Sequence, residues 1–198
     1  LKNSKKALKI YVNHFGMNHH DSSLTLSNIS GIFRESGNNE KANYFARKGM
    51  EVDFTLIQKE APFLIQEDRF DYLESVLGGG PDMAYSQALK SPSGRELAFF
   101  VRLNRQGLLE DIERKQAQLV NLSDKNKFLV KELKQITNRL SSQAFSKDER
   151  SEILSKKDSL EKKIYRLLPK LNFEIINIQD ISKKLAPNSV LIEYQKYF

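Results

Sequence analysis

Cysteine and tryptophan are absent from these 198 residues, and glycine, proline and histidine are sparse. Without cysteine the chain has no disulfide, no thiolate metal site and no cysteine nucleophile. No apolar run approaches the ~18 residues that a membrane-spanning helix needs, so we predict no membrane association. The lack of cysteine also fits a reducing compartment, and we predict a cytoplasmic location.

Basic residues exceed acidic ones, 32 to 25, for a net charge of +7. Residues 102–170 hold 17 Lys or Arg against 10 Asp or Glu, which accounts for the whole surplus. The two signs alternate closely there, as in Lys131-Glu132 and Lys157-Asp158. Interleaved charges of this kind are typical of a solvated helix face with i,i+4 pairs. A basic helical module that binds nucleic acid is therefore the weakest of the functional readings.

A short pattern recurs near the start of the chain. Residues 6–10 (KALKI) return as residues 48–52 (KGMEV), 42 positions later, with the small residue and both apolar residues in register. A fixed period of this length is typical of stacked helical repeats, in which each unit buries its apolar face against a neighbour. Repeat arrays present binding surfaces, so this pattern favours an interaction function.

The residues around the second copy predict a helical hairpin. Apolar residues share one face of the first helix at 3.6 spacing: Leu26, Ile29, Ile32 and Phe33. Asp21 or Ser22 can cap its start, and Gly37 can adopt the left-handed conformation that ends it. The partner helix carries Ala42, Phe45, Ala46 and Gly49. Small residues at 42 and 49 predict a close approach of the two helices.

This hairpin resembles a tetratricopeptide repeat. The likeness is carried by residues 26–33 (LSNISGIF), Gly37 and Ala42, and the loop 15–19 (FGMNH) with the 42-residue period resembles the kinesin-light-chain-type variant. The sequence departs from the pattern at Ala46, where an aromatic residue is usual, and at Gly49, where alanine is usual. Both departures weaken packing and suit a terminal repeat.

The following residues predict more helices with clear breaks. Residues 53–76 read as helix interrupted near Pro62, and glycines 78–80 break the chain again. Three apolar-periodic segments follow at about 95–121, 124–142 and 147–168, with Asp124 and Ser146 as candidate caps. Short breaks between such segments predict a long antiparallel hairpin or three-helix bundle, with coiled-coil-like packing, that Pro169 ends.

The last residues read differently. Residues 173–178 alternate weakly, and the run Val190–Tyr194 follows Pro187, Asn188 and Ser189, which predicts a strand. The chain begins at Leu1 within a predicted helix and stops at Phe198 within a predicted strand. We therefore expect it to be a segment of a longer protein, with the remaining strands of that sheet beyond Phe198.

Three stretches together resemble bacterial proteins in which tetratricopeptide repeats precede a C-terminal CHAT domain. They are residues 100–110 (FVRLNRQGLLE), 165–169 (YRLLP) and 181–194 (ISKKLAPNSVLIEY). The resemblance implies a caspase-like peptidase fold with a His–Cys dyad in the parent. The present chain has no cysteine, so no catalytic residue is carried over and this chain is predicted not to be an enzyme.

The predicted fold is mainly α, with a short C-terminal β segment. We predict the end of a repeat array at 1–55, a helical connector at 56–94, a long-helix bundle at 95–172 and the start of CHAT at 173–198. The leading functional hypothesis is a protein–protein interaction scaffold that couples the array to a CHAT domain. The alternative is the regulatory arm of a caspase-like cysteine peptidase.

Candidate site residues are few. The three histidines have no metal-binding spacing, so we predict no metal and no cofactor. The best binding candidate is the inner surface of the repeat array, which first helices form. Its candidate residues are Ser23, Ser27, Asn28 and Arg34, which would hold a protein or peptide partner. The competing interpretation is a solvent-facing helix surface without a ligand.

Overall fold

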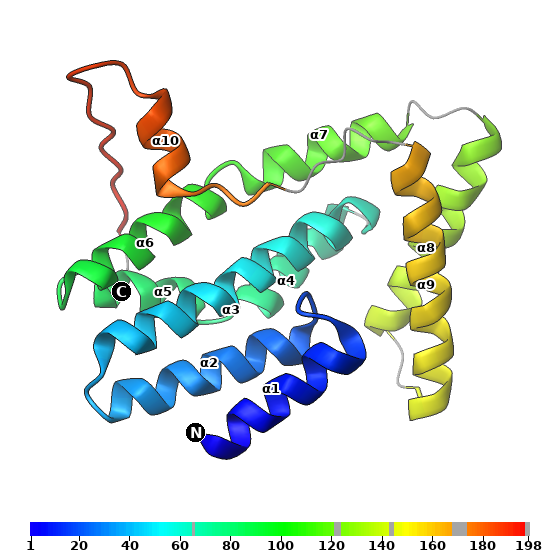
Figure 1. Cartoon of the computed structure of the whole chain (residues 1–198). Coiled ribbons are helices and arrows are strands. Elements are labelled where there is room, and N and C mark those ends of the chain that lie inside the picture. The colour runs from blue at the N-terminus through cyan, green and yellow to red at the C-terminus, as the bar shows by residue number, and fades with distance from the viewer. Residues whose placement is uncertain (65, 121–123, 143–144, 168–173, 197–198) are drawn as a thin grey trace. The chain divides into compact units, whose positions relative to one another are not determined.

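The computed structural model describes residues 1–64, 66–120, 124–142, 145–167 and 174–196, and these are mainly helical (Figure 1). This confirms the predicted mainly α class. The helices are α1 (Lys2–Phe15), α2 (His20–Glu35), α3 (Asn39–Glu60), the 3-10 turn η1 (Ala61–Phe63), α4 (Gln66–Leu77), α5 (Gly80–Gln87), α6 (Pro92–Arg105), α7 (Leu108–Val120), α8 (Asp124–Ser142), α9 (Lys147–Leu167) and α10 (Ile178–Lys184).

The contacts divide the chain into two compact units. Unit 1 comprises Leu1–Ile57, Leu73–Leu108 and Glu174–Phe198, and unit 2 comprises Gln58–Tyr72 and Leu109–Phe173. The predicted division into four segments, with boundaries at residues 55, 94 and 172, is not tested by this division into units and remains a prediction.

In unit 1, α2 and α3 pack closely side by side. The Ser30 hydroxyl donates to the backbone oxygen of Ala42 at 2.8 Å, and the Ser23 hydroxyl donates to that of Gly49 at 3.3 Å. Ala42 is fully buried. A Cβ atom placed on Gly49 would lie 3.3 Å from Ser27 Oγ, so a larger residue would push the helices apart. The predicted close approach at positions 42 and 49 is confirmed.

The start of α2 differs from the prediction. His19 caps the helix, because its Nδ1 accepts a hydrogen bond from the backbone N–H of Asp21 at 3.2 Å. Ser22 instead donates to the backbone oxygen of Gly16 at 3.2 Å. The predicted cap at Asp21 or Ser22 is therefore wrong. At the other end, Gly37 has φ +77°, as predicted for the residue that ends this helix.

Helices α5 and α6 also meet very closely. A Cβ atom on Gly94 would lie 1.9 Å from the backbone oxygen of Gln87, so only glycine fits there. Ser91 caps α6 by accepting from the N–H of Gly94 at 3.0 Å. The α3 residue Asn43 donates to the hydroxyls of Ser91 and Ser93, which ties the start of α6 to α3.

The predicted helix over 95–121 is two helices. Helix α6 ends at Arg105, α7 begins at Leu108, and Gly107 between them has φ +72°. A left-handed residue cannot continue a right-handed helix, and glycine adopts that conformation without strain. The single-helix prediction is therefore corrected by a turn at Gln106 and Gly107.

The C-terminal β segment is not confirmed. Among the described residues 174–196, α10 is the regular element, and the predicted strand Val190–Tyr194 pairs with no other strand of the described chain. Val190 and Tyr194 are 77% and 83% exposed. A strand needs a partner for its backbone groups, and the described part of the chain offers none. Pro169, which is predicted to end the last long helix, and Phe173, the first residue of the alternating stretch, lie outside the described residues.

In unit 2, α8 and α9 form the predicted hairpin, and Lys156 of α9 contacts Glu132 of α8 at 2.8 Å. Its buried apolar residues are Val130, Leu133, Ile136, Leu160 and Ile164. Ser146 caps α9 as predicted, and the carboxylate of Glu149 accepts from the Ser146 N–H at 3.0 Å, which completes a capping box.

Candidate binding cavity

One face of α2 carries a polar stripe. Its members recur at steps of three and four residues, which aligns them along the helix: His20, Ser23, Ser27, Ser30 and Arg34. Small hydroxyl side chains occupy the middle of the stripe and ionisable groups occupy its ends. Because serine side chains are short, they leave room beside α2 that longer side chains would fill.

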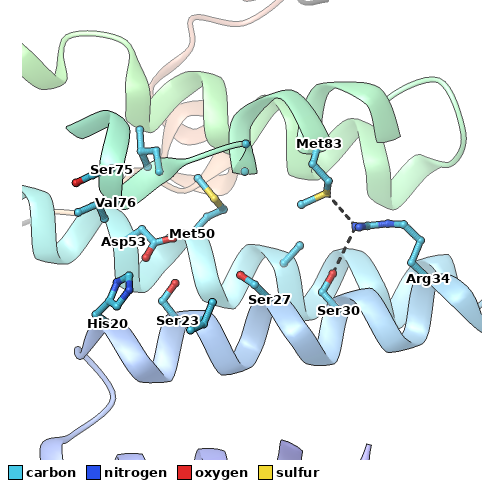
Figure 2. Close-up of a pocket in the computed structure, with 15 residues that line it drawn as sticks. His20, Ser23, Ser27, Ser30, Arg34, Met50, Asp53, Ser75, Val76 and Met83 are labelled. Atoms are coloured by element: carbon cyan, nitrogen blue, oxygen red, sulfur yellow. Dashed lines mark hydrogen bonds between the residues drawn. The ribbon is translucent and has the colours of Figure 1, made fainter. Parts of the chain in front are cut away.

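That room is a cavity of about 380 Å³ within unit 1 (Figure 2). Its floor comes from Ala46, Met50 and Asp53 of α3. The side opposite α2 is formed by residues 75–77 of α4, Gly79 and Gly80, and Met83 of α5. The volume lies within the ~300–1,000 Å³ typical of ligand pockets.

Asp53 is the buried acid of this cavity. It is 6% exposed and forms no ion pair with any residue that the structure describes. Burial raises the pKa of Asp53 to about 6, against the lowering effects of the Ser23 hydroxyl and of His20. The single hydroxyl hydrogen of Ser23 is shared between Asp53 and the Gly49 oxygen at 3.3 Å. The ionised carboxylate is therefore poorly satisfied by the protein itself.

Arg34 is the base at the other end of the stripe. Its Nη2 contacts Met83 Sδ at 2.9 Å and Ser30 Oγ at 3.4 Å (Figure 2). Its buried Nε has no hydrogen-bond partner, and no carboxylate pairs with the guanidinium, within the described ranges. Burial lowers the pKa of Arg34. A thioether is a weak acceptor, so the guanidinium keeps unused capacity for a strong one.

Three of the four predicted site residues line this cavity. They are Ser23, Ser27 and Arg34. Asn28 lines a different hollow of about 320 Å³ between α1 and α2, together with Tyr11 and Asp21. Asp53 and Met83 also line the cavity and were not predicted as site residues. The only local signal for Asp53 was a carboxylate between the apolar residues Val52 and Phe54.

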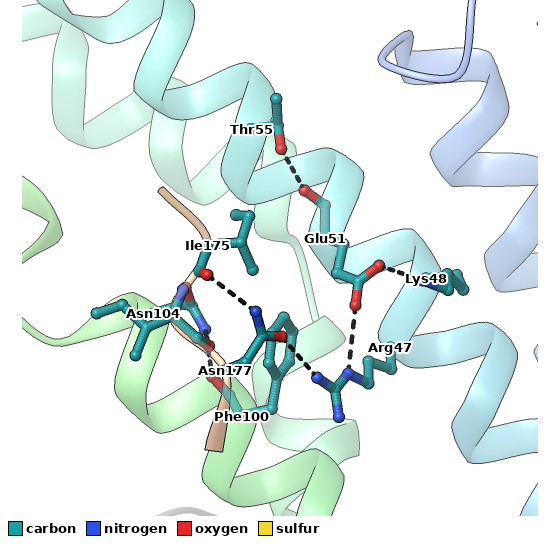
Figure 3. Close-up of polar contacts among 9 residues, drawn as sticks. Arg47, Lys48, Glu51, Thr55, Phe100, Asn104, Ile175 and Asn177 are labelled. Carbon is teal, nitrogen blue, oxygen red and sulfur yellow. Dashed lines mark hydrogen bonds and ion pairs between the residues drawn. The ribbon is translucent and has the colours of Figure 1, made fainter. Parts of the chain in front are cut away.

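A second polar cluster of unit 1 holds the chain near its C-terminus (Figure 3). Asn104 of α6 donates from Nδ2 to the Ile176 oxygen at 2.9 Å and accepts at Oδ1 from the Ile176 N–H at 2.8 Å. Arg47 of α3 donates to Asn177 Oδ1 at 3.0 Å and to Glu51 at 3.3 Å, and its guanidinium lies over the Phe100 ring at 4.5 Å. We call Arg47, Asn104 and residues 175–177 the backbone clamp.

The part of the chain that the structure describes contains no group of three His, Asp or Glu side chains arranged to hold a metal ion. None of its helices has the length and apolar character needed to span a membrane. His19, at the cap of α2, stacks on Phe15 with ring centroids 4.5 Å apart.

Comparison with known proteins gives no relatives. No protein-family model matches this chain, and no match was found among curated proteins or among solved structures.

Proposed function

We propose that this chain is an interaction segment: the end of a tetratricopeptide-type array that holds a protein or peptide partner and couples it to a CHAT peptidase-like domain. The observation that carries the binding half is the cavity beside α2, lined by a polar stripe and by two ionisable side chains that lack ion-pair partners in the described chain. The space of about 380 Å³ beside α2 supports this proposal over a helix surface that only contacts solvent.

The coupling half is supported by the position of α3. Met50 and Asp53 of this helix form the floor of the cavity, and Arg47 of the same helix belongs to the backbone clamp. A partner that shifts α3 would therefore act on residues 175–177, which precede the stretch that resembles the entry to CHAT. A rigid helix with contacts at both sites is a physical route for such coupling.

The binding half is tested by peptide display on the 198-residue chain, followed by affinity measurement of the selected peptides on two matched variants. Gly79 lines the cavity, and a Cβ atom there meets nothing within 4 Å, so Gly79→Phe should occupy cavity space without displacing the backbone. Gly31 on α2 is equally open but does not line the cavity, so Gly31→Phe is the control. We expect peptide binding to fall at least tenfold in Gly79→Phe only. Equal binding by both variants would exclude the cavity as the partner site.

The coupling half is tested by the coding sequence that follows Phe198. A histidine and a cysteine at caspase-like spacing would support the peptidase alternative for the parent, in which this chain is a regulatory arm. A CHAT-like sequence without that dyad would leave a scaffold. For the chain itself we predict no peptide cleavage, because a cysteine nucleophile is missing from its 198 residues.

A further inference from the structure

The cavity beside α2 contains two charges of opposite sign that the protein does not pair. Asp53 is 6% exposed without an ion pair, and Arg34 has a buried Nε without an acceptor, both judged over the described residues. An unpaired charge in a partly dry site costs free energy, and a ligand group of opposite charge recovers it. Two such groups in one cavity point to a ligand with one charge of each sign.

The positions of the two charges set the spacing of the ligand groups. Asp53 contacts Ser23, and Arg34 contacts Ser30. Seven residues along a helix correspond to about 10 Å. An extended peptide covers about the same distance in three residues. The hydroxyls of Ser23, Ser27 and Ser30 lie along this path. The Ser23 and Ser30 hydrogens are already donated to the backbone oxygens of Gly49 and Ala42, so these two hydroxyls can accept from a peptide N–H, and Ser27 can donate or accept.

We propose that the cavity binds a short extended peptide that places a basic side chain at Asp53 and a carboxylate at Arg34, about three residues apart. This assignment rests on the proposed interaction function and specifies its ligand chemistry. The ligand ammonium or guanidinium replaces the missing ion-pair partner of Asp53. The ligand carboxylate replaces the thioether of Met83, at 2.9 Å, as the acceptor for the guanidinium of Arg34.

The ligand order follows from the same contacts. The basic residue lies toward the start of α2, where His20 and Ser23 flank Asp53, and the carboxylate lies toward its end. A carboxylate placed at the Asp53 end would face a like charge, and a basic group at Arg34 would do the same. A singly charged peptide, or a bound peptide with its two charges exchanged between the ends, is therefore disfavoured by electrostatics rather than by shape.

The experiment uses four acetylated tetrapeptides with the 198-residue chain at pH 7.5 and low salt, followed by nuclear magnetic resonance titration. The parent peptide is acetyl-Lys-Ala-Ala-Ala with a free C-terminal carboxylate. The second has norleucine in place of lysine, the third has a C-terminal amide, and the fourth has both changes. We expect each single change to weaken binding at least tenfold. Because these changes are in the peptide, this comparison does not depend on the folding of any variant.

Protein variants then assign each charge to its residue. In Asp53→Asn, the lysine and norleucine peptides should bind equally, and in Arg34→Gln the acid and amide peptides should bind equally. Asp21→Asn, which lines the other hollow, is the matched control and should retain both tenfold effects. Thermal melting of each variant reports that it is folded.

Three outcomes would overturn the assignment. They are no binding of the parent peptide, equal binding of all four peptides by the unmodified chain, or a lysine effect that persists undiminished in Asp53→Asn. The proposed interaction function fails separately, when display-selected peptides ignore Gly79→Phe. If peptide binding falls in Gly79→Phe but does not change in Asp53→Asn or Arg34→Gln, the interaction function stands and the proposed ligand chemistry is wrong.

Discussion

Asn104 pairs with Ile176 as one strand pairs with another: the side-chain amide donates to the Ile176 oxygen at 2.9 Å and accepts from the Ile176 N–H at 2.8 Å. The second Nδ2 hydrogen goes to the Phe100 oxygen at 2.9 Å, so both donors and the acceptor of this buried amide are used. A helix thereby holds an extended segment without a sheet. Because both hydrogen bonds go to backbone atoms, they hold residue 176 in place whatever its side chain is.

Replacing this amide should release the segment. In Asn104→Leu the Ile176 N–H loses its acceptor. Because Ile176 is 40% exposed, water can replace that acceptor, and each lost hydrogen bond should cost about 0.5–1.5 kcal/mol. We expect amide exchange at Ile176 to accelerate markedly, as measured by nuclear magnetic resonance. Gln106→Leu, an exposed change on the following turn, should leave that exchange rate unaltered. Unchanged exchange in Asn104→Leu would mean that other contacts hold residues 175–177.

The seam between α2 and α3 predicts the effect of a larger side chain. Ala42 is fully buried and its backbone oxygen accepts from Ser30 at 2.8 Å, so position 42 has no room to expand. Ala42→Leu should destabilise the chain by about 1–3 kcal/mol through overpacking. Tyr44, on the same helix, is 57% exposed, and Tyr44→Leu should have a much smaller effect. Equal melting temperatures for the two variants would contradict the tight seam.

The sequence predicts correctly those helices, caps and turns that depend on residues close together in the chain. The α8–α9 hairpin follows from apolar steps of three and four, and Gly37 and Ser146 act as predicted because turn and cap chemistry depends on neighbouring residues. It is harder to predict from the sequence which of several neighbouring residues caps a helix. His19 caps α2 although Asp21 and Ser22 are more usual caps, since its ring also stacks on Phe15.

Features that depend on distant residues could not be predicted. The pKa of Asp53 depends on burial in a cavity whose far side comes from residues 75–83, which no window around position 53 contains. Asn104 and Ile176 are 72 residues apart in the sequence. The break at Gly107 was missed for a different reason: apolar spacing continues on both sides of it, so the period favours one helix where the backbone turns.

In unit 2 an ion pair with a buried lysine joins α9 to the end of α3. Lys157 Nζ lies 2.7 Å from Glu60 Oε1, and the Tyr72 hydroxyl donates to Glu60 Oε2 at 2.5 Å. Burial alone would raise the pKa of Glu60, but Lys157 and Tyr72 outweigh it, and the pKa is lowered. Lys157 is 6% exposed and the Glu60 side chain is 26% exposed, so loss of Lys157 would leave a partly buried carboxylate without its cation.

Lys157→Met should therefore destabilise the chain by about 1.5–3 kcal/mol at pH 7, the worth of a hydrogen bond to a charged group, as measured by urea unfolding. Lys157 interacts favourably with ionised Glu60, so the deficit should shrink as the pH falls and Glu60 becomes protonated. The neighbouring Lys156 is 60% exposed in its pair with Glu132, and Lys156→Met should cost less than about 1 kcal/mol. Similar losses for the two variants would exclude a special role for the pair with Lys157.

Asp53 and Glu60 should have opposite effects on how stability varies with pH. The pKa of Glu60 is lowered in the folded chain, whereas the pKa of Asp53, in unit 1, is raised. Its pKa is raised from 3.8 to about 6, so the folded state binds more protons than the unfolded state between these values. Stability from this group is complete below pH ~4 and is lost as the pH rises through about 6. The ionisable residues that share the cavity are His20 and Arg34 on α2, and the α4 and α5 residues that line it carry no charge.

Asp53→Asn removes this titration while its amide still meets the Ser23 hydroxyl. A difference of about two pKa units corresponds to about 3 kcal/mol, so the variant should be more stable than the unmodified chain at pH 7 by up to that amount. The gain should vanish near pH 4, where Asp53 is neutral in the folded chain. Urea unfolding at pH 4, 5, 6 and 7 measures the difference, in which the titration of Glu60 and every other shared group cancels.

Asp21→Asn, with a half-exposed carboxylate outside the cavity, should show no such trend. A stability difference that is independent of pH, or that grows toward pH 4, would show that Asp53 does not hold a buried carboxyl with a raised pKa. The cavity would then lack the acid on which its preference for a basic ligand depends.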